Sequence, residues 1–198
     1  MVHTNIIDSR VGSNAFSSDT AMLLVASHSG LFLVELDENL SIVNSEKIRS
    51  GYHYGISNPS FQNSGFKLFS YRGGDDVLLQ TEKTVNEYVY THGKFDLNKS
   101  YSLGDEIGEV HQIERTDKQE FSDSLYIANT ANNSVEFWSP ELGLIDKFHV
   151  NGAKSDVNHL NSIYVDGKDI AIMLHNRRRM ESQILLCLLY TSPSPRDS

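Results

Sequence analysis

Histidine, tyrosine and asparagine recur at matching places along this sequence, and these residue types could bind a ligand or do chemistry. Four segments each contain an apolar anchor, at intervals of 40, 57 and 50 residues: Phe16, Ile56, Ile113 and Ile163. A polar or aromatic residue stands two positions before each anchor: Asn14, Tyr54, His111 and Asn161. His53 and His159 lie one or two positions earlier still. If the segments are equivalent parts of a repeat, these side chains converge around one axis.

Such a cluster could bind a metal ion or a polar ligand. Amide and carboxylate oxygens suit calcium, whereas imidazole suits zinc or iron-type metals. His111 and His159 are the candidate catalytic residues, because an imidazole beside an activated water could act as a general base. The alternative is that the same groups cap strand ends and bind channel water, and the sequence alone favours that structural role.

A second set of polar residues follows the segments predicted to be the second strands: His28, Glu82, Asn129 and His175, with Asn176 next to the last. Asn and His at such places often satisfy the backbone groups of a turn. The sequence favours this turn role, above all for the Asn-rich stretch 129–133. His175 and Asn176 stay candidate ligand-binding residues.

The elements that must position these residues are short β-strands. Residues 125–138 and 144–150 read as three β runs separated by an Asn-rich turn and a Gly turn. This antiparallel meander repeats with a period of roughly 40 to 58 residues, which is typical of β-propeller blades. No segment has sustained helical periodicity. The predicted fold is all-β, a β-propeller fragment of about four antiparallel four-stranded blades, in which the first strand of each blade lines a central channel.

Four copies of the meander can be laid over one another. The first spans about 13–49, with strands at 22–27, 31–36 and 40–45. The second spans about 52–103, with strands at 77–82, 85–90 and 95–103 and an insertion at 58–65. The third spans about 110–150, and the fourth begins at residue 159, with strands at 170–174 and 182–186. Because no linker separates the copies, residues 1–186 are predicted to form one domain.

The composition limits the possible partners. The 198-residue chain has a formal net charge of −9 and 39% hydrophobic residues. An acidic surface argues against binding to nucleic acid or to anionic membranes, and no apolar run approaches the roughly 18 residues of a membrane span. A small molecule or a protein is therefore the expected partner. The N-terminus has no visible secretory signal, so the cytoplasm is the default expectation.

The last twelve residues do not continue the repeat. Residues 187–198 resemble the translation of a sequencing-library adapter, so we exclude them from fold reasoning. Cys187, the single cysteine, belongs to this segment, and the fold is therefore expected to use no disulfide. A closed propeller of six or more blades would need further residues.

The third copy resembles the NHL-repeat consensus, in which a strand ending in Asn-Thr is followed by Asn-Asn and a new strand, although Ser134 stands where that family usually has Arg. Residues 161–167 are similar to the Asn-Gly-Leu-Ala segments of gluconolactonase-like six-bladed propellers. That resemblance implies that Asn161 could be a calcium ligand. The family's acidic ligands have no evident counterpart on the predicted channel strands.

Two functions follow as expectations. The first is a β-propeller scaffold that binds a small molecule or a protein through a polar site at the mouth of its channel. The alternative is a calcium-dependent hydrolase of the lactonase or esterase kind. A carboxylate on a channel-lining strand would favour the hydrolase.

Overall fold

The structure, a computed structural model, describes residues 3–7, 21–57, 59–62, 65–72, 83–92, 94–104, 107–116, 123–166, 169–176 and 180–188. This part of the chain is all-β and contains no α-helix; Val150–Gly152 forms a short 3-10 turn. It therefore also holds no helix long and apolar enough to cross a membrane.

The first half of the chain forms two antiparallel sheets. The first sheet has the order β1 (His3–Ile7), β2 (Ala21–Ser27), β3 (Gly30–Leu36), β4 (Ile42–Ser50). The second has the order β5 (His53–Ile56), β7 (Gly65–Arg72), β8 (Thr84–Thr91), β9 (Lys94–Ser102), and β6 (Ser60–Gln62) pairs with β7.

The second half repeats this pattern. The third sheet has the order β10 (Val110–Arg115), β11 (Leu125–Asn129), β12 (Ser134–Ser139), β13 (Gly143–His149). The fourth has the order β14 (Leu160–Asp166), β15 (Asp169–Leu174), β16 (Gln183–Leu188). Apart from the short β6, each sheet is thus a meander of sequential strands.

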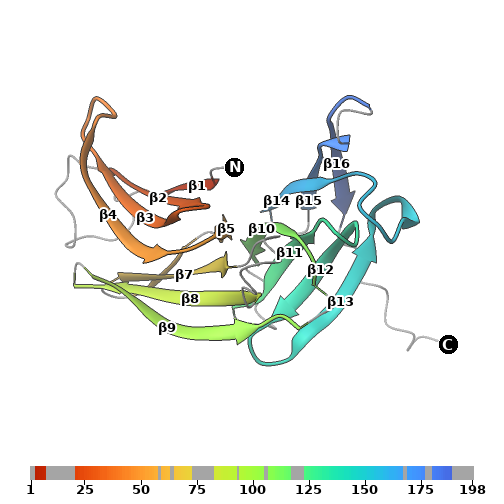
Figure 1. Cartoon of the computed structure of the whole chain (residues 1–198), viewed down its shortest axis with the longest axis horizontal. Helices are drawn as coiled ribbons and strands as arrows, with labels where there is room; N and C mark the ends of the chain where they lie inside the picture. Colours follow the sequence, from red (N-terminus) through yellow and green to blue (C-terminus); the bar gives the residue numbers. More distant parts are fainter. Residues whose placement is uncertain are drawn as a thin grey trace.

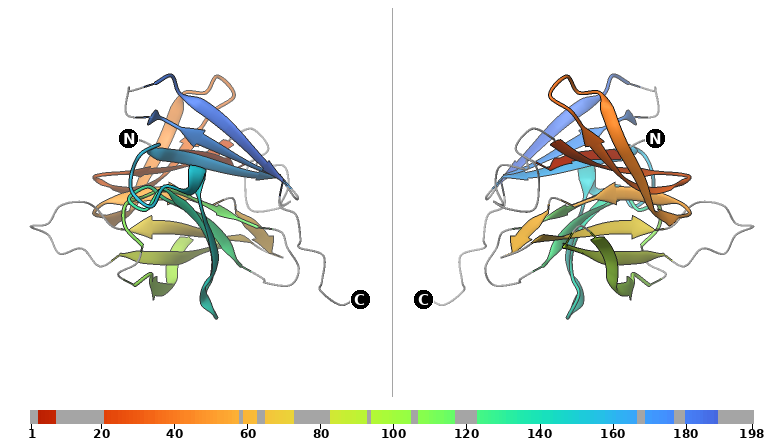
Figure 2. Two further views of the ribbon diagram at one scale, coloured as in Figure 1. Left: turned by 90° about the vertical axis from the view of Figure 1, so that its right-hand side faces the viewer. Right: turned by 90° about the vertical axis from the view of Figure 1, so that its left-hand side faces the viewer.

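The four sheets follow one another around a common centre, and β5, β10 and β14 lie nearest to it (Figure 1). The first strands are neighbours in space, since β10 contacts both β5 and β14, and β5 contacts β1. From the sides, the first and fourth sheets lie at one end of the molecule and the second and third at the other (Figure 2). This arrangement is that of a partial propeller, and it brings the first strands of successive sheets together.

The core consists of three buried clusters, one between each pair of successive sheets. The first joins sheets one and two and includes Leu24, Leu31, Ile56, Phe66 and Tyr88. The second joins sheets two and three and includes Phe69, Val85, Ile113, Ile127 and Trp138. The third joins sheets three and four and includes Tyr126, Ala128, Ile163, Ile170 and Ile172. Each sheet is therefore stabilised by its neighbours in the sequence.

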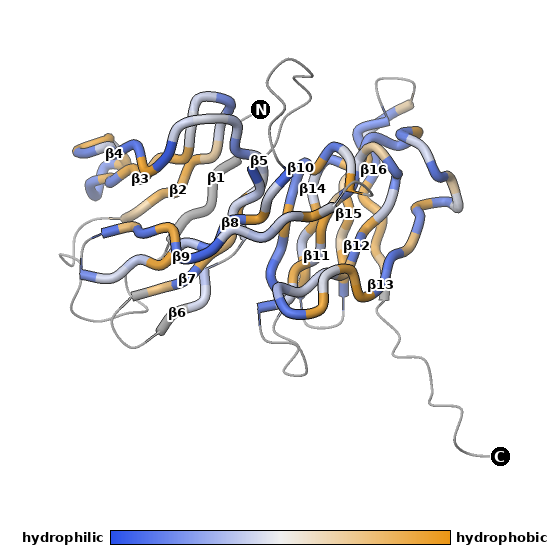
Figure 3. The backbone as a smooth tube through the Cα atoms, turned by 60° about the horizontal axis from the view of Figure 1, so that its bottom comes forward, coloured by the Kyte–Doolittle hydropathy of each residue, from blue (hydrophilic) through white to orange (hydrophobic). Residues whose placement is uncertain are grey.

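The alternation of side chains along a strand explains this packing. Leu125 and Ile127 on β11 face the second sheet, whereas Tyr126 and Ala128 face the fourth. All four are buried, because successive side chains of a strand point to opposite faces and both faces are covered. In Figure 3 the hydrophobic residues are orange, and orange segments lie in the region of β11 and its neighbours.

Most of the predicted strands are confirmed. Two are corrected: the second strand of the second sheet and the first strand of the first sheet. In the second sheet, β7 (Gly65–Arg72) pairs with β8, in the place predicted for 77–82, which lie outside the described residues. The segment predicted as an insertion instead contains β6. In the first sheet, β1 pairs with β2 in the place predicted for a strand around Phe16. Asn14 and Phe16 also lie outside the described residues.

The last strand of the fourth sheet ends later in the sequence than predicted, within the segment that was excluded from fold reasoning. β16 continues to Leu188, and Cys187 pairs with Ile170 and packs at the edge of the third cluster. The far side of this sheet exposes Tyr164, Ile184 and Leu186.

We predict that Ile113→Ala lowers the free energy of unfolding by about 2–5 kcal/mol, because Ile113 is 0% exposed in the second cluster. Urea unfolding followed by the fluorescence of Trp138, the single tryptophan, measures the loss within the same cluster. Ile184→Ala is the matched control: Ile184 is 71% exposed on a strand, so the change should stay within about 0.5 kcal/mol. Equal losses in both variants would contradict the packing described here.

Candidate functional site

The predicted anchors hold the first strands in place. Ile56 on β5, Ile113 on β10 and Ile163 on β14 are between 0% and 4% exposed and belong to the three interblade clusters. The predicted equivalence of these three copies is confirmed. The residues two positions before the anchors are therefore carried on the innermost strands at the same end.

An arc of polar rings crosses this end of the molecule and draws on all four sheets. Its members are six side chains in contact from one to the next: Tyr52, His28, Tyr54, His111, His159 and His175. The ring centroids of consecutive members lie between 5.0 and 6.1 Å apart. We call this set the ring arc.

The ring arc joins residues that the sequence assigned to two separate sets. Tyr54 and His111 come from first strands, whereas His28 and His175 follow the second strands β2 and β15. The Tyr54 hydroxyl is hydrogen-bonded to Nε2 of His28 at 2.9 Å, and the ring of His159 lies 5.8 Å from that of His175. His28 and His175 were expected to stabilise their turns. Their rings also contact Tyr54 and His159, so both belong to the ring arc.

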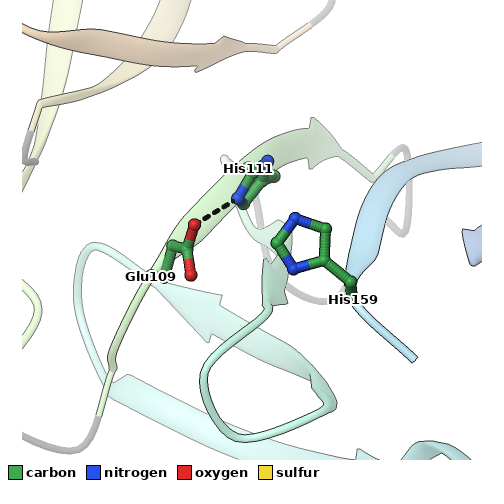
Figure 4. Close-up of side chains that lie close together, drawn as sticks. All are labelled: Glu109, His111 and His159. Carbon is green, nitrogen blue, oxygen red and sulfur yellow. Dashed lines mark hydrogen bonds and ion pairs between the residues drawn. The ribbon is translucent and has the colours of Figure 1, made fainter. Parts of the chain in front are cut away.

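Two histidines of the ring arc are paired with carboxylates. Nε2 of His111 lies 2.7 Å from Oε1 of Glu109, and Nδ1 of His159 lies 3.1 Å from Oδ2 of Asp156. The two imidazoles meet edge to face, with centroids 5.0 Å apart. Glu109, His111 and His159 thus converge from the beginning of β10 and the segment before β14 (Figure 4).

This convergence can hold a metal ion. One ligand atom from each of Glu109, His111 and His159 lies within 4.8 Å of the other two. Ligands around a tetrahedral zinc ion are about 3.4 Å apart, given bonds of about 2.0–2.1 Å, so a shift of about an ångström closes the set. The bond from His159 Nδ1 to Asp156 leaves the lone pair on Nε2, as in the carboxylate–histidine arrangements that orient metal ligands.

Backbone hydrogen bonds hold both halves of this cluster. The backbone N–H of Thr130 donates to the carbonyl of Glu109, and its hydroxyl donates to the carbonyl of Leu160, at 2.7 and 2.6 Å. His159 has a positive φ of 48°, in the left-handed region. Its carbonyl accepts a bond from the backbone N–H of His175. These bonds fix the spacing between β10 and β14.

A row of buried asparagines supports the same segment. Nδ2 of Asn133 donates to Oδ1 of Asn158, and Nδ2 of Asn158 donates to Oδ1 of Asn176, each at 3.2 Å. Asn133 and Asn176 both have positive φ, which Asn tolerates better than most residues. The prediction that the Asn-rich turn is structural is confirmed here. Asn176, a predicted ligand-binding residue, is 1% exposed and occupied by this network.

The side chain of His53 is buried and lies outside the ring arc. It is 0% exposed, and its Nδ1 is hydrogen-bonded to the hydroxyl of Ser70 at 3.2 Å. Burial, together with the positive charges of Arg72 and Arg49, lowers the pKa of His53 from 6.5 to about 4. His53 is therefore neutral at pH 7 and does not join the ring arc.

Asn161 lies on β14, two residues after His159. Its Oδ1 is buried and accepts no hydrogen bond from the described residues. Asn129 is fully buried and structural, since its Oδ1 accepts the N–H of Gly108 and its Nδ2 donates to Glu136. Glu82 lies outside the described residues.

The sequence analysis missed three residues of the site. Glu109 and Asp156 supply the carboxylates that seemed absent, and Tyr52 extends the ring arc. The available signal was the spacing Glu109-Val-His111, because residues two apart on a strand share a face.

Comparison with known proteins does not assign the chain to a family. No protein-family model matches the chain, and no curated protein matches it.

The lowered pKa of His53 makes stability depend on pH. The unfolded chain takes up this proton near pH 6.5 and the folded chain only near pH 4, so the folded state binds fewer protons between these values. This contribution to stability is complete above about pH 6.5 and is lost as the pH falls towards 4. The loss should amount to about 3 kcal/mol.

Urea unfolding of wild type and His53→Gln at several pH values measures this effect. The difference between their free energies of unfolding should shrink between pH 6.5 and 4. His92→Asn, at an exposed turn, is the control and should keep the wild-type slope. A wild-type slope in His53→Gln would contradict the burial of a neutral imidazole.

Proposed function

We propose that this chain is part of a β-propeller whose channel mouth binds a small ligand through a divalent transition-metal ion held by Glu109, His111 and His159. The observation that carries the proposal is the convergence of the three ligand atoms within 4.8 Å. Three protein ligands leave a coordination position open for a ligand, as in zinc sites that bind substrates.

The nature of the donors favours zinc or a similar ion over calcium. Two imidazoles and one carboxylate suit zinc, iron and related metals, whereas calcium requires six to eight oxygen ligands. The calcium hypothesis rests on Asn161, whose Oδ1 is an available oxygen acceptor. The calcium hypothesis makes a different prediction, because calcium binding would then depend on Asn161.

The ring arc supports a binding role for the whole mouth. His28, Tyr52 and Tyr54 line one side of the metal cluster and His175 the other. Rings with a polar edge and an apolar face bind planar or polar molecules well. Kinship with NHL-repeat or gluconolactonase-like six-bladed propellers belongs to this proposal and rests on the Asn-Thr and Asn161 motifs. The proposed binding site could also take a protein partner in place of a small molecule.

The second candidate function is a metal-assisted hydrolase of the lactonase or esterase kind. The two histidine–carboxylate pairs, Glu109 with His111 and Asp156 with His159, favour it, because a carboxylate orients an imidazole that accepts a proton. In this alternative a metal ion held by Asn161 would polarise the substrate carbonyl and activate water, since an imidazole bound to a metal cannot also accept the proton.

The metal proposal predicts tight Zn²⁺ binding that depends on the three ligands. Competition with a chromophoric chelator should show that His159→Asn, His111→Asn and Glu109→Gln weaken Zn²⁺ binding. The loss should exceed the roughly 10–100-fold that removal of an outer-shell partner costs. His92→Asn is a matched control for His159→Asn, because His92 is exposed and both residues have left-handed backbones with φ of 51° and 48°.

The outcomes separate the two metals. Zn²⁺ affinity that is equal in wild type and His159→Asn would refute the cluster. Ca²⁺ binding that is lost in Asn161→Ala and retained in Glu109→Gln would replace it with the calcium hypothesis.

The hydrolase makes a further prediction. The metal-loaded protein should hydrolyse a simple lactone or aryl ester, and a chelator or His111→Asn should abolish turnover while His92→Asn leaves it unchanged. Tight metal binding without turnover would reject the hydrolase and leave the binding function.

A further inference from the structure

Two arginines lie beside the ring arc. Arg49 is the penultimate residue of β4, and Arg72 is the last residue of β7. Among the described residues, neither guanidinium forms an ion pair with a carboxylate. Both are half-buried.

The arginines surround a buried imidazole. Arg72 is the β-sheet partner of His53, and both arginines are close enough to His53 for their charges to disfavour its protonation. Nδ1 of His53 is hydrogen-bonded to Ser70, while its Nε2 is buried. Neither this Nε2 nor the buried Nε of Arg72 has a hydrogen-bond partner among the residues that the structure describes. A fully buried donor or acceptor left unsatisfied is costly, so a ligand that satisfies it is stabilised.

The same cluster includes a tyrosine hydroxyl. Burial raises the pKa of Tyr88, and the nearby charges of Arg49 and Arg72 oppose that rise. The Tyr88 phenol is therefore a neutral donor beside both guanidiniums. Two arginines and the tyrosine hydroxyl are hydrogen-bond donors, and the neutral imidazole of His53 donates through Nε2 when the Ser70 hydroxyl donates to its Nδ1.

The cluster adjoins the mouth. The guanidinium of Arg72 lies against Gly51, where a Cβ would be 3.4 Å from its terminal nitrogen. Gly51 is followed by Tyr52, and His53 by Tyr54, and both tyrosines contact His28 in the ring arc. The guanidinium of Arg72 thus lies beside the backbone that precedes Tyr52, whose ring leads through His28 and Tyr54 to His111.

We propose that Arg49, Arg72, His53 and Tyr88 form an oxyanion-binding subsite, and that the molecule bound at the channel mouth carries a carboxylate or a phosphate. The planar fork of a guanidinium matches both groups in a bidentate manner. The subsite stands on its own contacts, and only the claim that it serves the same ligand as the metal cluster rests on the proposed function.

Isothermal titration of the metal-free protein with inorganic phosphate and, separately, with benzoate tests the subsite. At least one of these anions should bind, and Arg72→Gln and Arg49→Gln should weaken it by at least about tenfold, as expected for loss of a charged hydrogen bond. Stronger binding of phosphate assigns a phosphate-bearing ligand, and stronger binding of benzoate a carboxylate.

Lys94→Gln is the control, since it removes one positive charge at an exposed position on β9. An equal loss in Lys94→Gln would reduce the effect to general charge and overturn the proposal, as would unchanged affinity in both arginine variants. Arg72→Lys keeps the charge and removes the fork, so it should weaken binding even if Arg72→Gln does not fold.

Zn²⁺ titrations of the same variants keep the two proposals apart. The arginine variants should bind Zn²⁺ like wild type. Anion binding in a protein that fails to bind Zn²⁺ would refute the metal centre and leave the subsite; Zn²⁺ binding without anion binding would do the reverse.

Discussion

Burial of apolar side chains between successive sheets is the constraint on which the rest of the structure depends. A four-stranded meander has two apolar faces, and neither is stable in water, so each sheet requires a neighbour. The three interblade clusters meet this requirement in sequence order and pull the first strands towards a common centre. The polar residues that precede Ile56, Ile113 and Ile163 then converge without any contact of their own having to drive them together.

Polar hydrogen bonds refine what apolar burial makes possible. The row Asn133, Asn158 and Asn176 links the third sheet to the fourth at the segment that carries His159. Thr130 ties the same segment to Glu109. His159 itself has a left-handed backbone, which is uncommon outside glycine and asparagine, and such positions cluster at functional sites. The network therefore stabilises a local conformation whose most direct consequence is the meeting of two imidazoles and two carboxylates.

The sequence predicts the architecture well because the period-two pattern and the turns are local signals. The meanders of the third and fourth sheets follow from residues 125–150 and 160–186 almost unchanged. The second sheet was harder to predict, because both 65–72 and 77–82 have strand-like composition and only tertiary pairing places β7 beside β8. The placement of Tyr54, His111 and Asn161 on the first strands followed from the repeat, although it is His159 whose ring contacts His111. The pairing of Glu109 and Asp156 with particular histidines, and the separation of His53 from the ring arc, depend on side-chain directions that no periodicity encodes.

The charges around the ring arc are divided between its two ends. Glu109 and Asp156 lie at the end of His111 and His159, whereas Arg49 and Arg72 lie at the end of Tyr52 and Tyr54. Opposite charges that are separated in this way leave an electric field along the arc. A ligand with one anionic group and one group that coordinates a metal would be complementary to both ends. In the described part of the chain, Nε2 of His53 and Nε of Arg72 are buried without a hydrogen-bond partner, so the proposed subsite would favour an anionic ligand over a neutral apolar one.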